Sequence, residues 1–137
     1  MKLVVDTNIL MAALIKDSSI RKIIVTSKHD FYIPQAAVEE IYGYIDLISK
    51  KNSLSREENL QFLSTLLKYM KKVDFEFYKH KMKEGKKIIG KIDKKDIPFI
   101  ALALSFENNG IWTEDKHFEK QKKIKTWRTT HLLSLKH

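Results

Sequence analysis

Three aspartates of this sequence border apolar segments, at positions where a carboxylate is not expected. They are Asp6 after the run 2–5, Asp96 before the segment 99–106, and Asp115 after the run 111–113. Each acid taken alone has a structural explanation, because aspartate caps helices and occupies turns. The three acids become informative only when their positions are considered together.

A fourth acid, Glu40, lies at the border of an apolar helix face. Successive residues of a helix turn by about 100°, which places Ile41, Ile45 and Ile48 on one face of a predicted helix over residues 35–49. Glu40 falls at the edge of that face, whereas the neighbouring glutamate points to solvent. A carboxylate that leans into a core is costly unless a positive charge or a hydrogen-bond donor meets it.

The four acids would converge if the strand before Asp6 and the strand before Asp115 are neighbours, since the carboxyl ends of parallel strands meet at one crevice. Clustered carboxylates repel one another and hold protons at neutral pH unless a divalent cation neutralises them. Oxygen-only ligands suit Mg²⁺ or Mn²⁺, which fix a water nucleophile and stabilise charge on a phosphate. The candidate catalytic and metal-binding residues are therefore Asp6, Glu40, Asp96 and Asp115.

The elements that must position these acids follow an α/β pattern. Apolar runs of strand length alternate with longer stretches of helical period, which is typical of a mostly parallel sheet. The predicted strands are 2–5, 31–33, 73–77 at a sheet edge, 111–113 and 124–129. The predicted helices are 8–15, one that starts at Asp17-Ser18-Ser19, 35–49, 55–69 with a capping box, 78–89, and one that begins at 93–98 and is the most buried.

Length and composition exclude several classes of protein. A chain of 137 residues has the typical length of one domain, so we expect a single domain over residues 1–137. The absence of cysteine excludes disulfide scaffolds, thiol catalysis and thiolate zinc sites. No apolar run approaches the ~20 residues of a membrane span, and Asp6 interrupts the stretch that a signal peptide needs. These features predict a cytoplasmic protein.

The positive charge of the chain is concentrated in its second half. Residues 1–70 carry 9 Lys+Arg and 8 Asp+Glu, whereas residues 71–137 carry 17 and 9, so the halves contribute +1 and +8 to the net +9. A solvated lysine-rich face explains most such excesses, but a polyanion is the partner to test. The candidate phosphate contacts are Lys86, Lys87, Lys91, Lys94, Lys95 and Lys116, with Lys79, Lys81 and Lys83 in the same basic stretch.

Four motifs together resemble the PIN domain family of metal-dependent ribonucleases, which includes the VapC-type toxins of toxin–antitoxin pairs. They are Leu3-Val4-Val5-Asp6-Thr7-Asn8, Ile33-Pro34 followed by Glu40-Ile41, Asp93-Lys94-Lys95-Asp96 running into Phe99-Ile100-Ala101-Leu102-Ala103, and Ile111-Trp112-Thr113-Glu114-Asp115-Lys116-His117-Phe118. Any one motif arises by chance, but the four stand in family order over nearly the whole chain.

The resemblance implies a three-layer α/β/α fold around a parallel sheet of about five strands in the order 3-2-1-4-5. The implied site residues are Asp6, Glu40 and Asp96 as core metal ligands, Asp115 as the fourth acid, and Thr113 and Asn8 in support. The implied activity is hydrolysis of RNA phosphodiester bonds with bound Mg²⁺ or Mn²⁺. The implied partners are RNA, a small antitoxin protein, and further copies of the chain in a homodimer or larger homo-oligomer.

Two residues near these acids have open roles. Asp93 could support the site or serve as an alternative ligand, and it could equally be a helix cap. His117 stands where many relatives have another acid. It could contact phosphate, but a solvated histidine after a turn is the simpler interpretation.

Two other phosphoryl-transfer folds fit the residues less well. Phosphatases of the haloacid dehalogenase type need a second acid where this chain has Asn8. Response-regulator receivers need an acidic pair after the first strand and a phosphoacceptor aspartate after the third, and neither pattern is present. The four glycines are isolated, so the chain has no glycine-rich phosphate-binding loop. The alternative from another class is a catalytically silent PIN-fold module that binds RNA or protein. Within the nuclease interpretation, a toxin and a housekeeping ribonuclease share one site.

Overall fold

A parallel five-stranded sheet forms the centre of the computed structural model, which describes residues 1–15 and 18–135. The strands are β1 (Lys2–Val5), β2 (Asp30–Pro34), β3 (Met70–Val73), β4 (Ile111–Trp112) and β5 (Thr126–Trp127). Their order is β3-β2-β1-β4-β5, so β1 is central, with Leu3 paired to Phe31 and Val5 paired to Trp112. This order confirms the predicted fold class.

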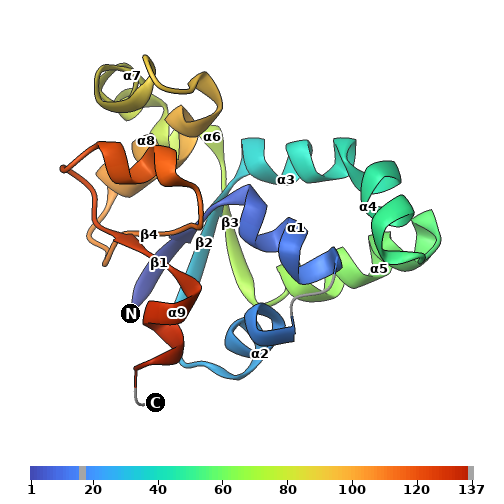
Figure 1. Cartoon of the computed structure of the whole chain (residues 1–137). Coiled ribbons are helices and arrows are strands. Elements are labelled where there is room, and N and C mark those ends of the chain that lie inside the picture. The colour runs from blue at the N-terminus through green and yellow to red at the C-terminus, as the bar shows by residue number, and fades with distance from the viewer. Residues whose placement is uncertain (16–17, 136–137) are drawn as a thin grey trace.

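Helices cover both faces of the sheet and make three layers (Figure 1). One side carries α1 (Thr7–Ile15), α2 (Ser18–Thr26), α3 (Gln35–Gly43), α4 (Ile45–Asn52), α5 (Arg56–Leu67) and α9 (Thr129–Leu133). The other side carries α6 (Phe75–Tyr78), α7 (Met82–Ile89) and α8 (Ile97–Ser105), with 3₁₀ turns η1 (Lys79–Lys81), η2 (Lys94–Asp96) and η3 (Lys116–Lys120). No helix in the described part of the chain has the length and hydropathy of a membrane span.

The core lies where the sequence is most apolar. Leu3, Val4 and Val5 are fully buried because β1 is covered by helices on both faces of the sheet. Helix α8 packs on β1 and β2, and its residues 99–103 are all buried, as predicted for the most apolar helix. These two segments bring Asp6 and Asp96 to their positions, since each acid directly adjoins a buried element.

The prediction of a strand over residues 73–77 is wrong. The edge strand β3 ends at Val73, and α6 begins at Phe75 after a helical N-cap at Asp74. The alternation of Phe75 and Phe77 does not reflect a buried sheet face, because the two residues are 45% and 50% exposed. The pairing partners of β2 are instead residues 70–73, and the edge position itself was predicted correctly.

Several element boundaries also differ from the sequence prediction. The single helix expected over 35–49 is two helices, α3 and α4, separated at Tyr44, whose φ of −100° and ψ of 4° break the helical geometry. The fifth strand is shorter than 124–129, and Asp17 lies outside the described residues. The capping box of α5 is confirmed, because Ser55 accepts the Glu58 N–H and Glu58 accepts the Ser55 N–H, each at 3.0 Å.

Gly110 permits the entry of the chain into β4. Its φ of +122° lies in the region that favours glycine, and a methyl group at this position would overlap the Lys125 carbonyl oxygen. That carbonyl accepts the Ile111 N–H at 2.9 Å, and the Gly110 carbonyl accepts the Val4 N–H at 2.9 Å. The glycine therefore lies between β1 and β5, where β4 joins the two.

We expect Gly110→Ala to lower the free energy of unfolding by at least about 2 kcal/mol, because the added methyl strains the backbone and collides with the Lys125 carbonyl just before β5. The matched control is Gly43→Ala, where the added methyl meets nothing within 4 Å and should change stability by no more than about 1 kcal/mol. Chemical denaturation of both variants measures the difference. Equal stabilities would show that the close approach at Gly110 imposes no constraint.

Candidate functional site

A pocket of about 220 Å³ lies at the carboxyl edge of the sheet, where β1 and β4 end. It is lined mainly by polar side chains and contains the acids that the sequence singled out. The lining residues are Asp6, Thr7, Asn8, Met11, Glu40, Tyr44, Asp93, Lys95, Asp96, Phe99 and Asp115. The structure thus brings all four candidate acids into one pocket.

Asp6 is buried at the end of β1, with 4% of its surface exposed. Its Oδ2 accepts a hydrogen bond from the Thr113 hydroxyl at 2.8 Å, and its carboxylate also accepts the backbone N–H of Asn8. Burial is the largest influence and raises the pKa of Asp6 to about 6, and the charges of Asp115 and Glu40 add to the rise. The two hydrogen bonds partly oppose this rise because they stabilise the charged form.

Asp96 is equally buried, with 5% of its surface exposed, at the start of α8. It occupies the N-cap position, but its side chain makes no capping hydrogen bond, so capping does not explain this acid. The pKa of Asp96 is raised to about 7, mainly by burial and in addition by the charges of four neighbouring carboxylates, of which Asp93 contributes most. Its Oδ2 has no hydrogen-bond partner within the described residues.

Thr113 connects two of the acids through a single hydroxyl. The hydroxyl donates to Asp6 and accepts the Asp115 N–H at 2.9 Å, while Asp115 Oδ1 accepts the His117 N–H at 2.9 Å. Asp115 is therefore both a turn acid and a lining residue of the pocket. The supporting position that the resemblance implied for Thr113 is a bridge between the ends of β1 and β4.

Asp93 divides its two oxygens between the backbone and the acid cluster. Its Oδ1 accepts the Lys95 N–H at 2.9 Å as the cap of η2, and its Oδ2 lies 3.7 Å from the Nδ1 atom of His117. Asp93 is therefore a cap, and it also lines the pocket, where the role of supporting residue or ligand stays a prediction.

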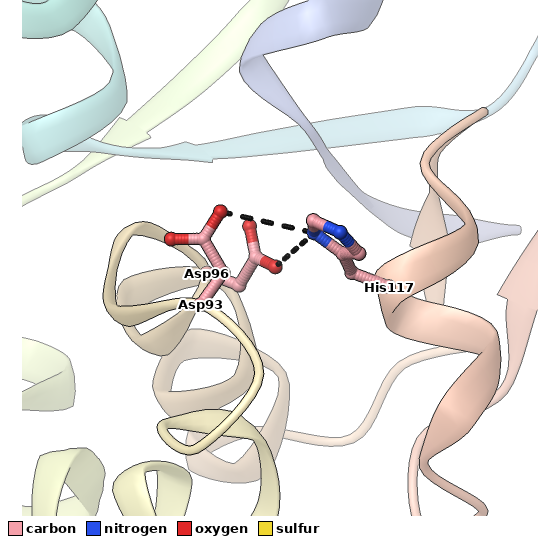
Figure 2. Close-up of side chains that lie close together, drawn as sticks. All are labelled: Asp93, Asp96 and His117. Atoms are coloured by element: carbon pink, nitrogen blue, oxygen red, sulfur yellow. Dashed lines mark ion pairs between the residues drawn. The ribbon is translucent and has the colours of Figure 1, made fainter.

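His117 is a partly solvated residue after a turn, and in addition its ring faces the acids. Its side chain is 42% exposed, and Nδ1 faces three carboxylates, at 3.5 Å from Asp115, 3.7 Å from Asp93 and 3.8 Å from Asp96. Figure 2 shows the imidazole of η3 pointing across to the two acids around η2. No local sequence signal identifies this contact, because Asp93 and Asp96 lie more than twenty positions before His117 in the chain.

Glu40 and Asn8 complete the rim of the pocket. Glu40 extends from α3 and is half-buried, as its place at the border of the apolar face predicted. Asn8, in the first turn of α1, is exposed and contributes its backbone N–H to Asp6. The pocket thus receives acids from both helical layers and from the sheet.

The predicted basic residues fall into two groups. Lys79 and Lys81 are ion-paired with Glu76 and Glu84, at 2.7 Å and 3.4 Å. The seven other lysines are exposed and make no ion pair within the described residues, and Lys95 also lines the pocket. They are Lys83, Lys86, Lys87, Lys91, Lys94, Lys95 and Lys116.

The chemistry of the pocket fits a divalent cation. Its charged lining is dominated by carboxylates, and the Oδ2 of Asp96 is buried without a hydrogen-bond partner in the described structure. Carboxylate oxygens are the ligands that Mg²⁺ and Mn²⁺ prefer, and a cation would offset the burial and repulsion that raise the pKa values of Asp6 and Asp96.

The strand order and the acid pocket define an α/β/α protein with a carboxylate site at the end of its central strands. A family model described as PIN domain matches residues 4–135, and the chain belongs to the PIN domain family. No curated protein matches the chain. Six chains of solved structures match it. One comes from the crystal structure of VapBC2 from Rickettsia felis bound to a DNA fragment from their promoter, with a TM-score of 0.68, 19% identity, and coverage of 93% of this chain and 98% of that one.

The raised pKa values predict that the metal-free protein loses stability as the pH rises. Asp6 and Asp96 bind protons more tightly when folded, at pKa values of about 6 and 7, than the unfolded chain does near ~3.9. The folded state therefore holds more protons between these values, so the contribution of these two acids to stability is fully present below about pH 4 and is lost as the pH rises through 6 and 7. Asp96→Asn should reduce the loss between pH 5 and pH 7 by roughly 2 kcal/mol.

Thermal unfolding in EDTA across this pH range measures the effect. The control Asp46→Asn removes an acid that is 78% exposed and paired with Arg56, and it should keep the wild-type pH slope. A slope for Asp96→Asn as steep as that of the wild type would contradict the assignment of the raised pKa.

Proposed function

We propose that this protein is a metal-dependent ribonuclease that hydrolyses RNA phosphodiester bonds, with residues 1–137 forming one nuclease domain. The observation that carries the proposal is the convergence of Asp6, Glu40, Asp96 and Asp115 in one pocket of a PIN-domain chain. These acids would hold Mg²⁺ or Mn²⁺, and the bound ion would supply an activated water and stabilise charge on the phosphate.

The residues of the chain prepare this chemistry in distinct ways. Thr113 and the Asn8 backbone fix the Asp6 carboxylate, and Asp93 lies among the acids as a supporting residue. The unpartnered Oδ2 of Asp96 is available to a cation without breaking an existing hydrogen bond. The site therefore needs no rearrangement of hydrogen bonds at Asp96 when a metal binds.

The unpaired lysines would hold the RNA backbone. Three of them, Lys86, Lys87 and Lys91, belong to α7 or follow it, and Lys94 and Lys95 belong to η2, which packs against α7. Contacts of this kind bind phosphates irrespective of base sequence. RNA is therefore the proposed partner without an assigned target sequence.

A role as the toxin of a toxin–antitoxin pair is supported by the likeness of the fold to a VapBC2 chain. On this proposal a small antitoxin protein binds the toxin, the chain assembles with further copies of itself, and the complex resides in the cytoplasm. Growth arrest on expression, together with loss of that arrest in Asp6→Ala, would support the toxin role over that of a housekeeping ribonuclease.

The nuclease proposal predicts that Asp6→Asn and Asp96→Asn each lower the rate of RNA cleavage by about a hundredfold or more, because each removes a metal ligand. Cleavage of structured and unstructured RNA with Mg²⁺, with Mn²⁺ and with EDTA measures this. Asp46→Asn is the control and should cleave at the wild-type rate. Activity in EDTA, or activity in both site variants, would contradict the proposal, and RNA binding without cleavage by the wild type would favour a silent binding module.

The backbone contacts make a separate prediction about salt. Replacing Lys86, Lys87 and Lys91 by glutamine should weaken RNA binding and reduce the salt slope by about 2, since each contact with single-stranded RNA contributes about 0.7. Fluorescence anisotropy between 50 and 200 mM salt measures the slope. The control replaces the exposed lysines Lys50, Lys51 and Lys68, which removes the same charge from α4 and the end of α5. Equal slopes in the two triple variants would rule out this surface as the RNA contact.

A further inference from the structure

Aromatic side chains form a continuous strip on the face of the sheet that carries α6 and α8. The ring of Tyr32, in β2, lies with its centroid 4.7 Å from that of Phe106, which directly follows α8. The Phe106 centroid in turn lies 6.3 Å from that of Phe77, in α6. Lys71 of β3 completes the row, because its Nζ lies 5.3 Å from the Tyr32 centroid. We call these four residues the aromatic strip.

The register of the two outer strands produces this arrangement. Lys71 pairs with Tyr32 across β3 and β2, and paired residues of neighbouring strands point to the same face of a sheet. Helices α3 and α5, which pack on β3, belong to the opposite layer, whereas α8 packs on β1 and β2. The aromatic strip therefore borders the outer margin of the sheet on the side of α6 and α8.

The aromatic strip is accessible to a ligand. Phe77 is 50% exposed, Lys71 is exposed, and Tyr32 and Phe106 are partly exposed. A phenylalanine ring that is half in water gains only part of the hydrophobic free energy that full burial would give, so the core does not account for Phe77. The exposed side of such a ring can stack on another flat ring without any rearrangement of the fold.

The charges beside the aromatic strip favour a polyanion over an apolar protein surface. Lys71 and Lys125 make no ion pair within the described residues. Lys125 lies with Phe106 in the lining of a neighbouring pocket of about 480 Å³, where Glu107 is the one acid among the lining residues. An apolar partner would bury these cations unpaired, whereas a nucleic acid supplies a phosphate for a cation and a base for a ring.

We propose that the aromatic strip binds the bases of single-stranded RNA at a site separate from the acid pocket. Bases stack on aromatic rings irrespective of their sequence, and cations beside the rings hold the phosphates between the bases. Bases of a duplex are already stacked on their neighbours, so the strip selects unpaired RNA. The inference rests on the proposed function in that it takes RNA as the ligand.

Helix α8 sets the distance between the aromatic strip and the acid pocket. Asp96 is the N-cap of α8 and Phe106 is its C-cap, and the nine helical residues between them span about 14 Å. An RNA strand held at both places therefore extends beyond the nucleotides that are cut. The strip would raise the affinity for such a strand by a second attachment, without contact to the reacting phosphate.

Fluorescence anisotropy with a labelled, unstructured RNA tests the aromatic strip, in EDTA and in the Asp6→Asn background so that the RNA stays intact. Phe77→Ala should weaken binding by about tenfold, the effect of losing one stacked base, and should leave the salt slope unchanged because no charge is removed. The control is Phe75→Ala, since Phe75 is 45% exposed in the same helix but its ring meets Tyr78 instead. Its affinity should stay within about twofold of the wild type. Equal affinities of the two variants would overturn the proposal.

Further variants separate stacking from a general effect on the fold. Tyr32→Phe keeps a ring and should retain the affinity for single-stranded RNA, whereas Tyr32→Leu should lose about tenfold. Lys71→Gln should instead reduce the salt slope by about 0.7, the contribution of one phosphate contact. Duplex RNA of the same length should lose no affinity in Phe77→Ala. A loss on duplex RNA as large as that on the single strand would contradict stacking.

A second copy of the chain is the competing occupant of the aromatic strip. Light scattering of the wild type and Phe77→Ala at equal protein concentration measures the assembly, and we expect the same mass for both. A lower mass for Phe77→Ala, together with wild-type affinity for single-stranded RNA, would assign the strip to an interface between copies and would overturn the proposal.

The binding assay and the cleavage assay fail independently of each other. Binding of single-stranded RNA that depends on Phe77, with no cleavage by the wild type, would support the aromatic strip and refute only the nuclease proposal. Cleavage by the wild type, with RNA binding that does not depend on Phe77, would refute only the strip.

Discussion

The hydrogen bond from the Thr113 hydroxyl to Asp6 joins the ends of two neighbouring parallel strands, and the acid pocket depends on it. Without this bond, a buried carboxylate would lose a donor that stabilises its charge. Because the same hydroxyl accepts the Asp115 N–H, it also determines where the chain turns after β4. One side chain therefore aligns an acid from the first strand with an acid from the fourth.

The acids of the site share a common design with one exception. Asp6, Asp93 and Asp115 each accept at least one hydrogen bond that fixes the side chain, from the Thr113 hydroxyl, the Lys95 N–H and the His117 N–H respectively. Asp96 has no such bond to its buried Oδ2. The packing of α8 determines its position instead. Its negative charge is the least compensated by hydrogen bonds, so a bound cation would stabilise it most. A single site thus combines three rigidly oriented acids with one that is held only by its helix.

The sequence predicted the sheet and the acids because both depend on patterns that are local in the chain. A buried strand followed by an aspartate is visible in residues 2–6 alone, whereas the strand order came from the resemblance to the PIN domain family. The edge strand was misplaced because β3 contains two exposed lysines, Lys71 and Lys72, and lacks an alternating apolar pattern. The adjacent aromatic pair in α6 mimicked that pattern on an exposed helix.

The environment of His117 could not be read from its neighbours in the sequence. Its orientation depends on η2 and η3 lying next to each other, and these turns belong to segments more than twenty residues apart. His117 follows a turn and has polar neighbours in the sequence. The same local sequence would fit a fully exposed histidine and one that contacts buried acids. Only the packing between the two turns brings the His117 ring to Asp93 and Asp96.

The order of the strands also has a consequence for folding. The Thr113 and Asp6 residues that meet in the site are separated by 107 positions, so the site forms only after a loop of nearly the whole chain has closed. Contacts between such distant segments are formed slowly compared with helices, because the entropy of loop closure is lost before the contact is gained. An incompletely synthesised chain therefore carries Asp6 and Glu40 but no complete site. The protein acquires its proposed activity late, when β4 pairs with β1.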